Sequence, residues 1–178
     1  MPGLAHLSGD RLALRMVDAL TGDRNRTFPD RALMTNLARL VDRSLVRYRE
    51  AGDYFSEWIA TRHQGNESAR FRAVSAIEES ITLTHRAVLH ARRLEDRLVD
   101  PKLMPTFAAC QTIKDMRDAI QHTEERLLGL RKPPISTGQP IFASFGEHGL
   151  ALGPQTLSYD TLARVLEALH SAVGSPID

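Results

Sequence analysis

Apolar residues recur at three- and four-residue spacing through most of the chain, which is the pattern of helices that bury one face. Pro29, a residue favoured in the first turn of a helix, predicts the start of a long helix that runs to about His63. The apolar stripe is interrupted near Ala51-Gly52, where a glycine favours a kink or a break. We expect the stripe to face the core, and it comprises Leu33, Leu37, Val41, Tyr48, Phe55 and Trp58 or Ile59.

Two further helices follow the first. The turn at 64–66 ends it, and Asn66 is a suitable N-cap for a second long helix over about 67–98. Prolines end that helix, because proline cannot donate the backbone hydrogen bond that would continue it. A third helix is predicted over about 106–128, with Gly129 as its C-terminal cap.

The two ends of the chain predict smaller elements. Residues 10–20 favour a short helix. Near the other end, apolar residues at 141–145 and 150–152 flank a glycine-rich turn and predict a β-hairpin, followed by an amphipathic helix over 158–173. The predicted fold class is therefore mainly α: an up-down helical bundle with a short β-hairpin and a C-terminal helix appended.

The composition is that of an ordinary globular domain. We expect one domain over 1–178, with a bundle core over about 30–130 and an appendage over 135–178. The net charge of +1 requires that any nucleic-acid-binding surface be local. Cys110 is the only cysteine, so an internal disulfide is ruled out, and we predict that it is a small residue packed in the interior. No apolar stretch is long enough for a membrane span, and 1–9 lacks the pattern of a secretory signal, so a cytoplasmic protein is expected.

The third helix contains the most informative stretch, Met-Arg-Asp-Ala-Ile-Gln-His at 116–122. With Ile120 taken as the core direction, Asp118 and His122 point to the opposite, polar side, and Arg117 lies on the flank between the two. An Arg five residues before a His occurs by chance in a chain so rich in arginine. Two further features make the match more specific than the spacing alone. An Asp follows the Arg directly, and the stretch lies late in a helical chain.

Arg117, Asp118 and His122 resemble the RxxxxH motif of the HEPN family, in which a polar residue often follows the arginine. The resemblance covers about residues 30–130 and does not extend to the hairpin or the last helix. It implies a helical bundle and, for many members, cleavage of RNA without a metal ion or another cofactor. It also implies a role as a toxin or defence effector.

The resemblance also assigns roles to the motif residues. A ribose 2′-hydroxyl that attacks its own phosphate needs a proton acceptor, a proton donor and a cation. His122 is suited to the proton transfers, since histidine changes its protonation near neutral pH. Arg117 presents a planar, permanently charged guanidinium to the phosphate oxygens. Asp118, or alternatively Glu125, would orient the imidazole of His122.

The geometry of a helix constrains this mechanism. Arg117 and His122 are about 140° apart around a continuous helix axis, so within one chain they converge poorly on one phosphate. Two such helices placed side by side in a homodimer would solve this, and HEPN proteins are similar in being commonly dimeric with their motifs at the interface. We therefore expect a homodimer, with RNA as a ligand and a protein inhibitor or antitoxin as a further partner.

Two other groups of side chains are candidates for binding. Arg86, His90, Arg93 and Arg97 follow one face of the second long helix, a spacing that would track an RNA backbone or serve as a solvated surface. A similar stripe on the first long helix comprises Arg39, Arg43 and Arg47. The aromatic residues Tyr48, Phe55 and Trp58 lie on the apolar stripe and are expected in the core rather than as base-stacking groups.

Two alternatives to a nuclease remain at this point. Asp115, Asp118, His122 and Glu125 share a helix face, but no Glu-x-x-His pair occurs on another helix, so no metal site is expected. The second alternative is a non-catalytic, HEPN-like helical dimer that binds a protein or nucleic acid through its exposed face or its hairpin. The surroundings of the polar face of the motif helix distinguish these possibilities: a groove shared by two chains supports a functional site, and exposure to bulk solvent supports a merely solvated surface.

Overall fold

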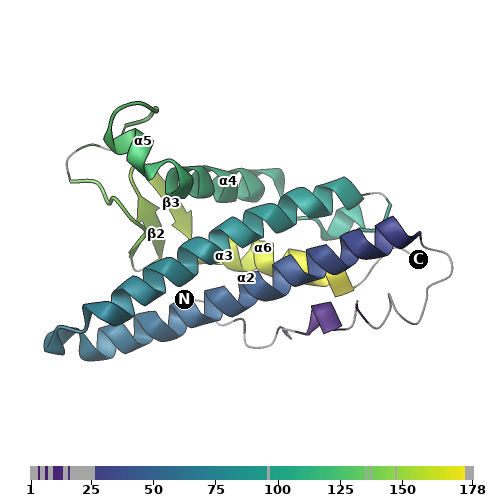
Figure 1. The fold of residues 1–178 in the computed structure, drawn as a ribbon, viewed down its shortest axis with the longest axis horizontal. Coiled ribbons are helices and arrows are strands. Elements are labelled where there is room, and N and C mark those ends of the chain that lie inside the picture. Colours follow the sequence, from purple (N-terminus) through teal and green to yellow (C-terminus); the bar gives the residue numbers. More distant parts are fainter. Residues whose placement is uncertain are drawn as a thin grey trace.

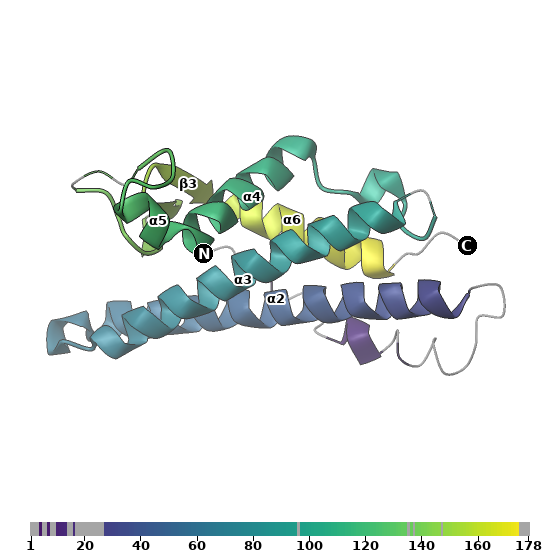
Figure 2. The same cartoon turned by 45° about the horizontal axis from the view of Figure 1, so that its top comes forward.

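The computed structural model describes residues 4, 7, 10–13, 16, 27–95, 97–134, 136, 138–146 and 148–174. The chain is mainly helical, with a small antiparallel sheet and a C-terminal helix. Two long antiparallel helices form one layer, and the shorter helices and the sheet that follow them in the chain lie together on one side of it (Figures 1 and 2). The predicted short helix over 10–20 lies for the most part outside the described residues.

The first long helix, α2 (Phe28–Thr61), begins where the sequence predicted. Thr27 is its N-cap, and the Thr27 hydroxyl accepts a hydrogen bond from a backbone N–H of the first turn. Pro29 lies in that same turn. The interruption expected near Ala51-Gly52 does not break the helix, which passes through both residues with the Ala51 side chain buried.

The connection to the second long helix also follows the prediction. A short 3₁₀ helix, η1 (Arg62–Gln64), is followed by Gly65, whose φ of +75° lies in the left-handed region that glycine adopts without strain. The side chain of Asn66 then accepts a hydrogen bond from the backbone of the first turn of α3 (Glu67–Leu94). Asn66 is therefore the N-cap, as predicted.

The helix α3 ends at Leu94, four residues before the predicted position 98. Glu95 has an extended ψ of 142°, which takes the chain out of the helix. The backbone N–H groups of Leu98 and Val99 then donate to the carbonyl oxygen of Leu94. A 3₁₀ helix, η2 (Pro101–Leu103), completes the connection to the next helix.

Small hydroxyl side chains fill the middle of the contact between α2 and α3. Ser44, Ser80 and Thr84 have no exposed surface. The Oγ of Ser44 lies 2.6 Å from the Oγ1 of Thr84, and the Ser80 hydroxyl donates to the Ser44 carbonyl oxygen at 3.0 Å. These short side chains satisfy one another across the interface, which lets the two helices pack closely.

The shorter helices are α4 (Phe107–Gln121), α5 (Thr123–Leu127) and α6 (Tyr159–Gly174). Cys110 on α4 is a free, buried cysteine, which confirms the packing role predicted for it. The helix α6 matches the predicted 158–173 closely, but it is not peripheral. Leu162 and Leu166 on α6 have no exposed surface and belong to the same core cluster as residues of α2, α3 and α4. The description of 135–178 as an appendage therefore has to be corrected for α6, because its apolar face completes the core.

The small sheet contains one strand more than predicted. The strands β1 (Ser144–Phe145) and β2 (Gly149–Leu152) form the expected hairpin, and β3 (Gln155–Ser158) pairs with β2 on its other side. The register places Leu150 opposite Leu157, and both side chains are buried. Contacts of the sheet with α4 and α6 supply the support that a lone hairpin would lack.

None of the helices in the described part of the chain combines the length and the apolar character needed to cross a membrane.

Candidate functional site

The helix that carries the Arg117–His122 motif is interrupted at the histidine. His122 has φ of −115° and ψ of 22°, and it separates α4 from α5. The hydroxyl of Thr123 donates to the carbonyl oxygens of Ala119 at 2.7 Å and Ile120 at 3.3 Å, a side-chain bond of the kind that bends helices. The single helix predicted over 106–128 is therefore two helices. The angle of about 140° between Arg117 and His122 assumed one continuous helix, and that helix ends at His122.

Arg117 and Asp118 form an ion pair with each other. The Nη1 of Arg117 lies 2.5 Å from the Oδ1 of Asp118, and the two side chains are 25% and 21% exposed. Neither side chain projects into bulk solvent, so this part of the polar face is half-buried rather than solvated. The sequence assigned the Asp118 carboxylate to His122, whereas in the structure Asp118 holds Arg117.

His122 has an acidic partner of its own. Its Nδ1 lies 3.0 Å from the Oε2 of Glu125, which is 3.7 Å from the Nη1 of Arg131. When Nδ1 carries the proton and donates it to Glu125, Nε2 carries the lone pair. Within the described chain no group hydrogen-bonds to Nε2. Glu125 was the second residue that the sequence suggested for orienting His122. It lies where it can hold the imidazole in the orientation and tautomer that a general base needs.

A second histidine approaches the motif from α3, and the sequence analysis did not identify it. His85 is only 6% exposed, and no group in the described parts of the chain hydrogen-bonds to its Nδ1. Burial lowers the pKa of His85, the positive charges of Arg117 and Lys114 lower it further, and Asp118 partly opposes them. The signal in the sequence is a polar residue four positions after Ile81 on the apolar stripe of α3.

The lowered pKa of His85 predicts a pH dependence of stability. Because the pKa of His85 is lower in the folded chain than in the unfolded chain, the unfolded chain takes up this proton first as the pH falls through the ordinary histidine value of about 6.5. The free energy of unfolding should therefore fall between pH 7.5 and pH 5.5, and His85→Leu should reduce this fall. Urea denaturation at both pH values measures it. His63→Ala, at an exposed position, should leave the pH dependence unchanged, and an unchanged dependence in His85→Leu would contradict the prediction.

Three of the four residues predicted to bind RNA lie together on α3. Arg86, His90 and Arg93 follow one another at helical spacing, with both arginines exposed. Arg97 lies beyond the end of α3, and its Nη2 is 2.5 Å from the Oδ1 of Asp30 at the start of α2. Arg97 therefore does not continue the stripe, because the helix ends at residue 94.

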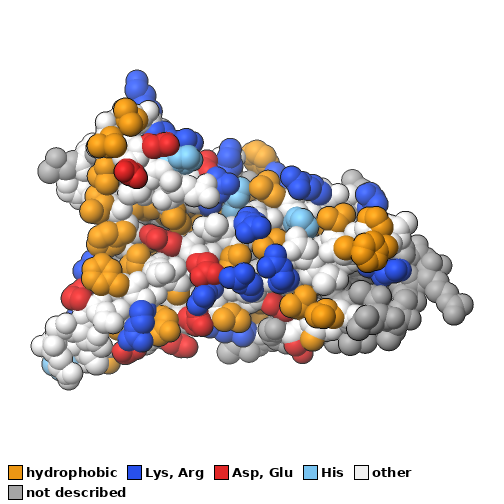
Figure 3. Space-filling view, in the orientation of Figure 1, with side chains coloured by type: hydrophobic (Ala, Val, Ile, Leu, Met, Phe, Trp, Pro, Cys, Tyr) orange, Lys and Arg blue, Asp and Glu red, His pale blue; other side chains and the backbone are white. Residues whose placement is uncertain are grey.

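The arginine stripe on α2 divides into two parts. Arg43 and Arg47 pair with Glu79 at 3.0 Å and 2.8 Å, and Arg47 also pairs with Glu50 at 2.6 Å. Arg39 instead donates to an amide oxygen on its own helix. In Figure 3, Lys and Arg side chains gather with histidines over the middle of α2 and α3 and along α4. The acidic partners on this face thus neutralise one part of the positive surface only.

A buried arginine follows the motif by one turn. Arg126 is 5% exposed, its backbone N–H donates to the carbonyl oxygen of His122, and the side chain atoms Nε and Nη1 find no hydrogen-bond partner among the described residues. Around it, exposed leucines end the helix: Leu127, Leu128 and Leu130. Leu127 continues the apolar spacing of Ile113, Met116 and Ile120, which predicts a buried position on a continuous helix, but after the break at His122 it is exposed.

The four residues considered for a metal site take part in three separate contacts. Asp115 accepts from the side chain of Gln111 at 2.8 Å, Asp118 binds Arg117, and His122 binds Glu125. Over the described ranges, no group of three or more His, Cys, Asp or Glu side chains is arranged to hold a metal ion.

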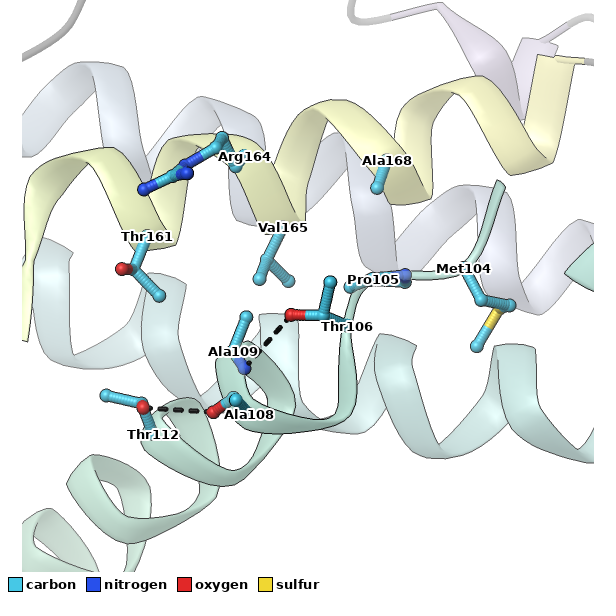
Figure 4. Close-up of a pocket in the computed structure, with 10 residues that line it drawn as sticks. All are labelled: Met104, Pro105, Thr106, Ala108, Ala109, Thr112, Thr161, Arg164, Val165 and Ala168. Carbon is cyan, nitrogen blue, oxygen red and sulfur yellow. Dashed lines mark hydrogen bonds between the residues drawn. The ribbon is translucent and has the colours of Figure 1, made fainter. Parts of the chain in front are cut away.

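A groove of about 420 Å³ lies between the first half of α4 and α6, away from the motif (Figure 4). Its hydroxyl groups are engaged, since Thr106 caps α4 and Thr112 donates to the carbonyl oxygen of Ala108 at 3.0 Å. Arg164 is the charged residue of its lining and donates to the carbonyl oxygen of Asp160. The groove therefore offers mainly apolar surface, and none of the motif residues contributes to it.

Compared with protein-family models, with curated proteins and with solved structures, the chain matches none of them.

Proposed function

We propose that this protein is a metal-independent endoribonuclease of the HEPN type, in which His122 transfers protons and Arg117 stabilises the phosphate. The observation that carries the proposal is the pairing of His122 with Glu125, which leaves Nε2 open at a break between two helices. Arg117 and the buried Arg126 supply positive charge on the same segment of chain. A helix face that is merely solvated would not require half-buried and buried arginines.

The chemistry follows from these positions. The Nε2 of His122 accepts the proton of a ribose 2′-hydroxyl as its oxygen forms a bond to the adjacent phosphorus. Asp118 occupies one nitrogen of Arg117, while the other guanidinium nitrogens have no hydrogen-bond partner in the described chain and can bind the phosphate oxygens. The bond from phosphorus to the 5′-oxygen breaks, and an imidazolium returns a proton to that oxygen. The products are a 2′,3′-cyclic phosphate and a 5′-hydroxyl.

The proposal includes an assembly and a setting. Because one histidine acts as base and one as acid, a homodimer with two motifs along a shared groove would supply both. The helices would then form an up-down bundle of the HEPN kind in each chain, and Arg86, His90 and Arg93 would extend the RNA-binding surface. We place the protein in the cytoplasm as a toxin or defence effector, with a protein inhibitor as its partner.

Incubation of a mixed RNA with the protein in EDTA tests the activity. We expect cleavage to proceed in the chelator and to leave 2′,3′-cyclic phosphate ends, because the proposed groups are an imidazole and a guanidinium. End-group analysis of the products is the measurement. Cleavage that stops in EDTA, or that leaves a 3′-hydroxyl, would contradict the mechanism.

A second candidate function is a non-catalytic dimer that binds a protein or nucleic acid. The exposed leucines that follow the motif favour it, since Leu128 and Leu130 are 66% and 77% exposed at the end of a helix. The RNA assay separates the two functions: a dimer that retains RNA intact in EDTA and in Mg²⁺ would support the binding module.

A further inference from the structure

A chain of hydrogen bonds links α2 to α3 at one end of their exposed face. The Nη2 and Nε of Arg39 donate to the Oδ1 of Asn36 at 2.8 Å and 3.2 Å. The Nδ2 of Asn36 lies 3.1 Å from the Nε2 of His90 on α3. Since the oxygen of the Asn36 amide faces Arg39, its NH₂ group faces His90 and donates to Nε2. His90 is therefore an acceptor in this contact, and it positions Arg39 through Asn36.

Positive charge is concentrated around this chain of bonds. Burial lowers the pKa of His90, and the positive charges of Arg93 and Arg86 on α3 and Arg39 on α2 lower it further. None of the three arginines forms an ion pair with a residue that the structure describes. The protein as a whole carries a net charge of only +1, so this uncompensated charge is local.

The same face provides a comparison. Farther along α2, Arg43 and Arg47 have acidic partners at 3.0 Å or less. A surface that was only generally basic would leave these two arginines as available as the other three. The structure instead leaves positive charge available at the end where Asn36 joins the helices.

An apolar hollow adjoins the charged cluster. Asn36 and Arg39 form part of its wall, its volume is about 430 Å³, and it lies along the first turns of α2. Phe28, which is 75% exposed, and Ala32 contribute apolar surface to it. An exposed aromatic ring beside unpaired arginines is the combination that binds a base and its phosphate in single-stranded nucleic acid.

We infer that this surface binds one segment of single-stranded RNA, with successive backbone phosphates held by Arg39, Arg86 and Arg93 and a neighbouring base lying against Phe28. The choice of RNA rests on the proposed function. The location is argued independently, because Phe28, Arg39, Arg86 and Arg93 lie on α2 or α3, whereas Arg117 and His122 belong to α4 and its end. The site would hold the strand while another part of it reaches the motif.

Fluorescence anisotropy with a labelled 2′-O-methyl RNA dodecamer tests the site, because this strand lacks the attacking hydroxyl and stays intact. We expect Arg39→Gln, Arg86→Gln and Arg93→Gln each to weaken binding about 5-fold at 0.1 M salt. Each should also lower the slope of log affinity against log salt by about 0.7, the value for one phosphate contact on a single strand. Phe28→Leu, which keeps an apolar side chain without the ring, should weaken binding by about 5- to 150-fold.

Arg47→Gln is the matched control, since it removes the same charge from the same helix at an ion-paired position. It should leave both affinity and salt slope nearly unchanged, and equal losses in Arg47→Gln and Arg39→Gln would overturn the site. Unlabelled 5′-UMP that displaced the dodecamer at equal concentration would overturn the assignment to a strand. Full RNA cleavage with no change of binding in the three variants would refute the site alone, whereas intact binding without cleavage would refute the proposed function alone.

Discussion

Replacement of His122 by alanine is expected to lower the rate of RNA cleavage by at least about 100-fold, the lower end of what a positioned general acid or base contributes. The variant removes the only group in the motif that both accepts and donates a proton at neutral pH. It should leave the fold intact, because the His122 side chain is 26% exposed and its helix-ending hydrogen bonds come from the backbone. Gel analysis of RNA cleavage in EDTA, with circular dichroism for the fold, measures both.

Two further variants sharpen this result. His63→Ala removes an exposed histidine at the far end of α2 and should retain full activity. Glu125→Gln keeps a hydrogen-bond acceptor for Nδ1 and loses the charge, so it should lower the rate less than His122→Ala does. Retained cleavage in His122→Ala would remove the proposed mechanism altogether.

Replacement of Leu166 by alanine is expected to lower the free energy of unfolding by about 2–5 kcal/mol. Leu166 has no exposed surface and lies in the core cluster that α6 shares with α2, α3 and α4. A cavity at this position affects all of these helices at once, so the whole chain should unfold in one transition at lower urea concentration. Chemical denaturation followed by circular dichroism gives the free energy.

Leu128→Ala is the matched control, because it makes the same chemical change at a side chain that is 66% exposed. Its effect should stay within about 0.5 kcal/mol. If Leu166→Ala had an equally small effect, or if α6 melted separately from the other helices, α6 would be the appendage that the sequence suggested.

The start of each long helix could be predicted from the sequence, because the responsible residues are local. Pro29 and Asn66 act within one turn of themselves, through a fixed φ and through a side-chain hydrogen bond. The end of α3 could not be placed in the same way. Positions 95–98 keep helical spacing in the sequence, and the chain leaves the helix at Glu95 through a backbone conformation that no residue type there requires.

The break at His122 shows a second limit of the sequence. The apolar spacing of Ile113, Met116 and Ile120 continues to Leu127, and it predicts one helix. Thr123 interrupts that helix by donating to two carbonyl oxygens of the preceding turn, a competition that hydrophobic periodicity does not register. The candidate site was found from spacing within one helix, so partners from other segments, such as His85, were missed.

The roles assigned to acidic residues changed for a related reason. Asp118 and Glu125 are both within one turn of His122, and the sequence could only consider both as its partner. Asp118 also adjoins Arg117, and a carboxylate binds a permanently charged guanidinium more strongly than a neutral imidazole. Similarly, Arg97 continued the α3 stripe in sequence, whereas Asp30 on a different helix determines its position. Which of several possible partners a charged side chain binds depends on the residues that surround it in the folded chain, and sequence spacing does not give these.

The hydroxyl cluster of Ser44, Ser80 and Thr84 determines how α2 and α3 are aligned lengthwise. If α2 slid along α3 by one turn, about 5.4 Å, the buried hydroxyls of Ser44 and Ser80 would lose their partners on the other helix, at a cost of about 1–3 kcal/mol each, whereas Thr84 would keep its bond to the carbonyl oxygen of Ser80. Apolar side chains of similar size would tolerate such a slide. Asn36 meets His90 in this one register. The small hydroxyl side chains in the interior thus fix the register of α2 against α3. This register in turn determines which charged side chains of the two helices lie next to one another on the outer surface.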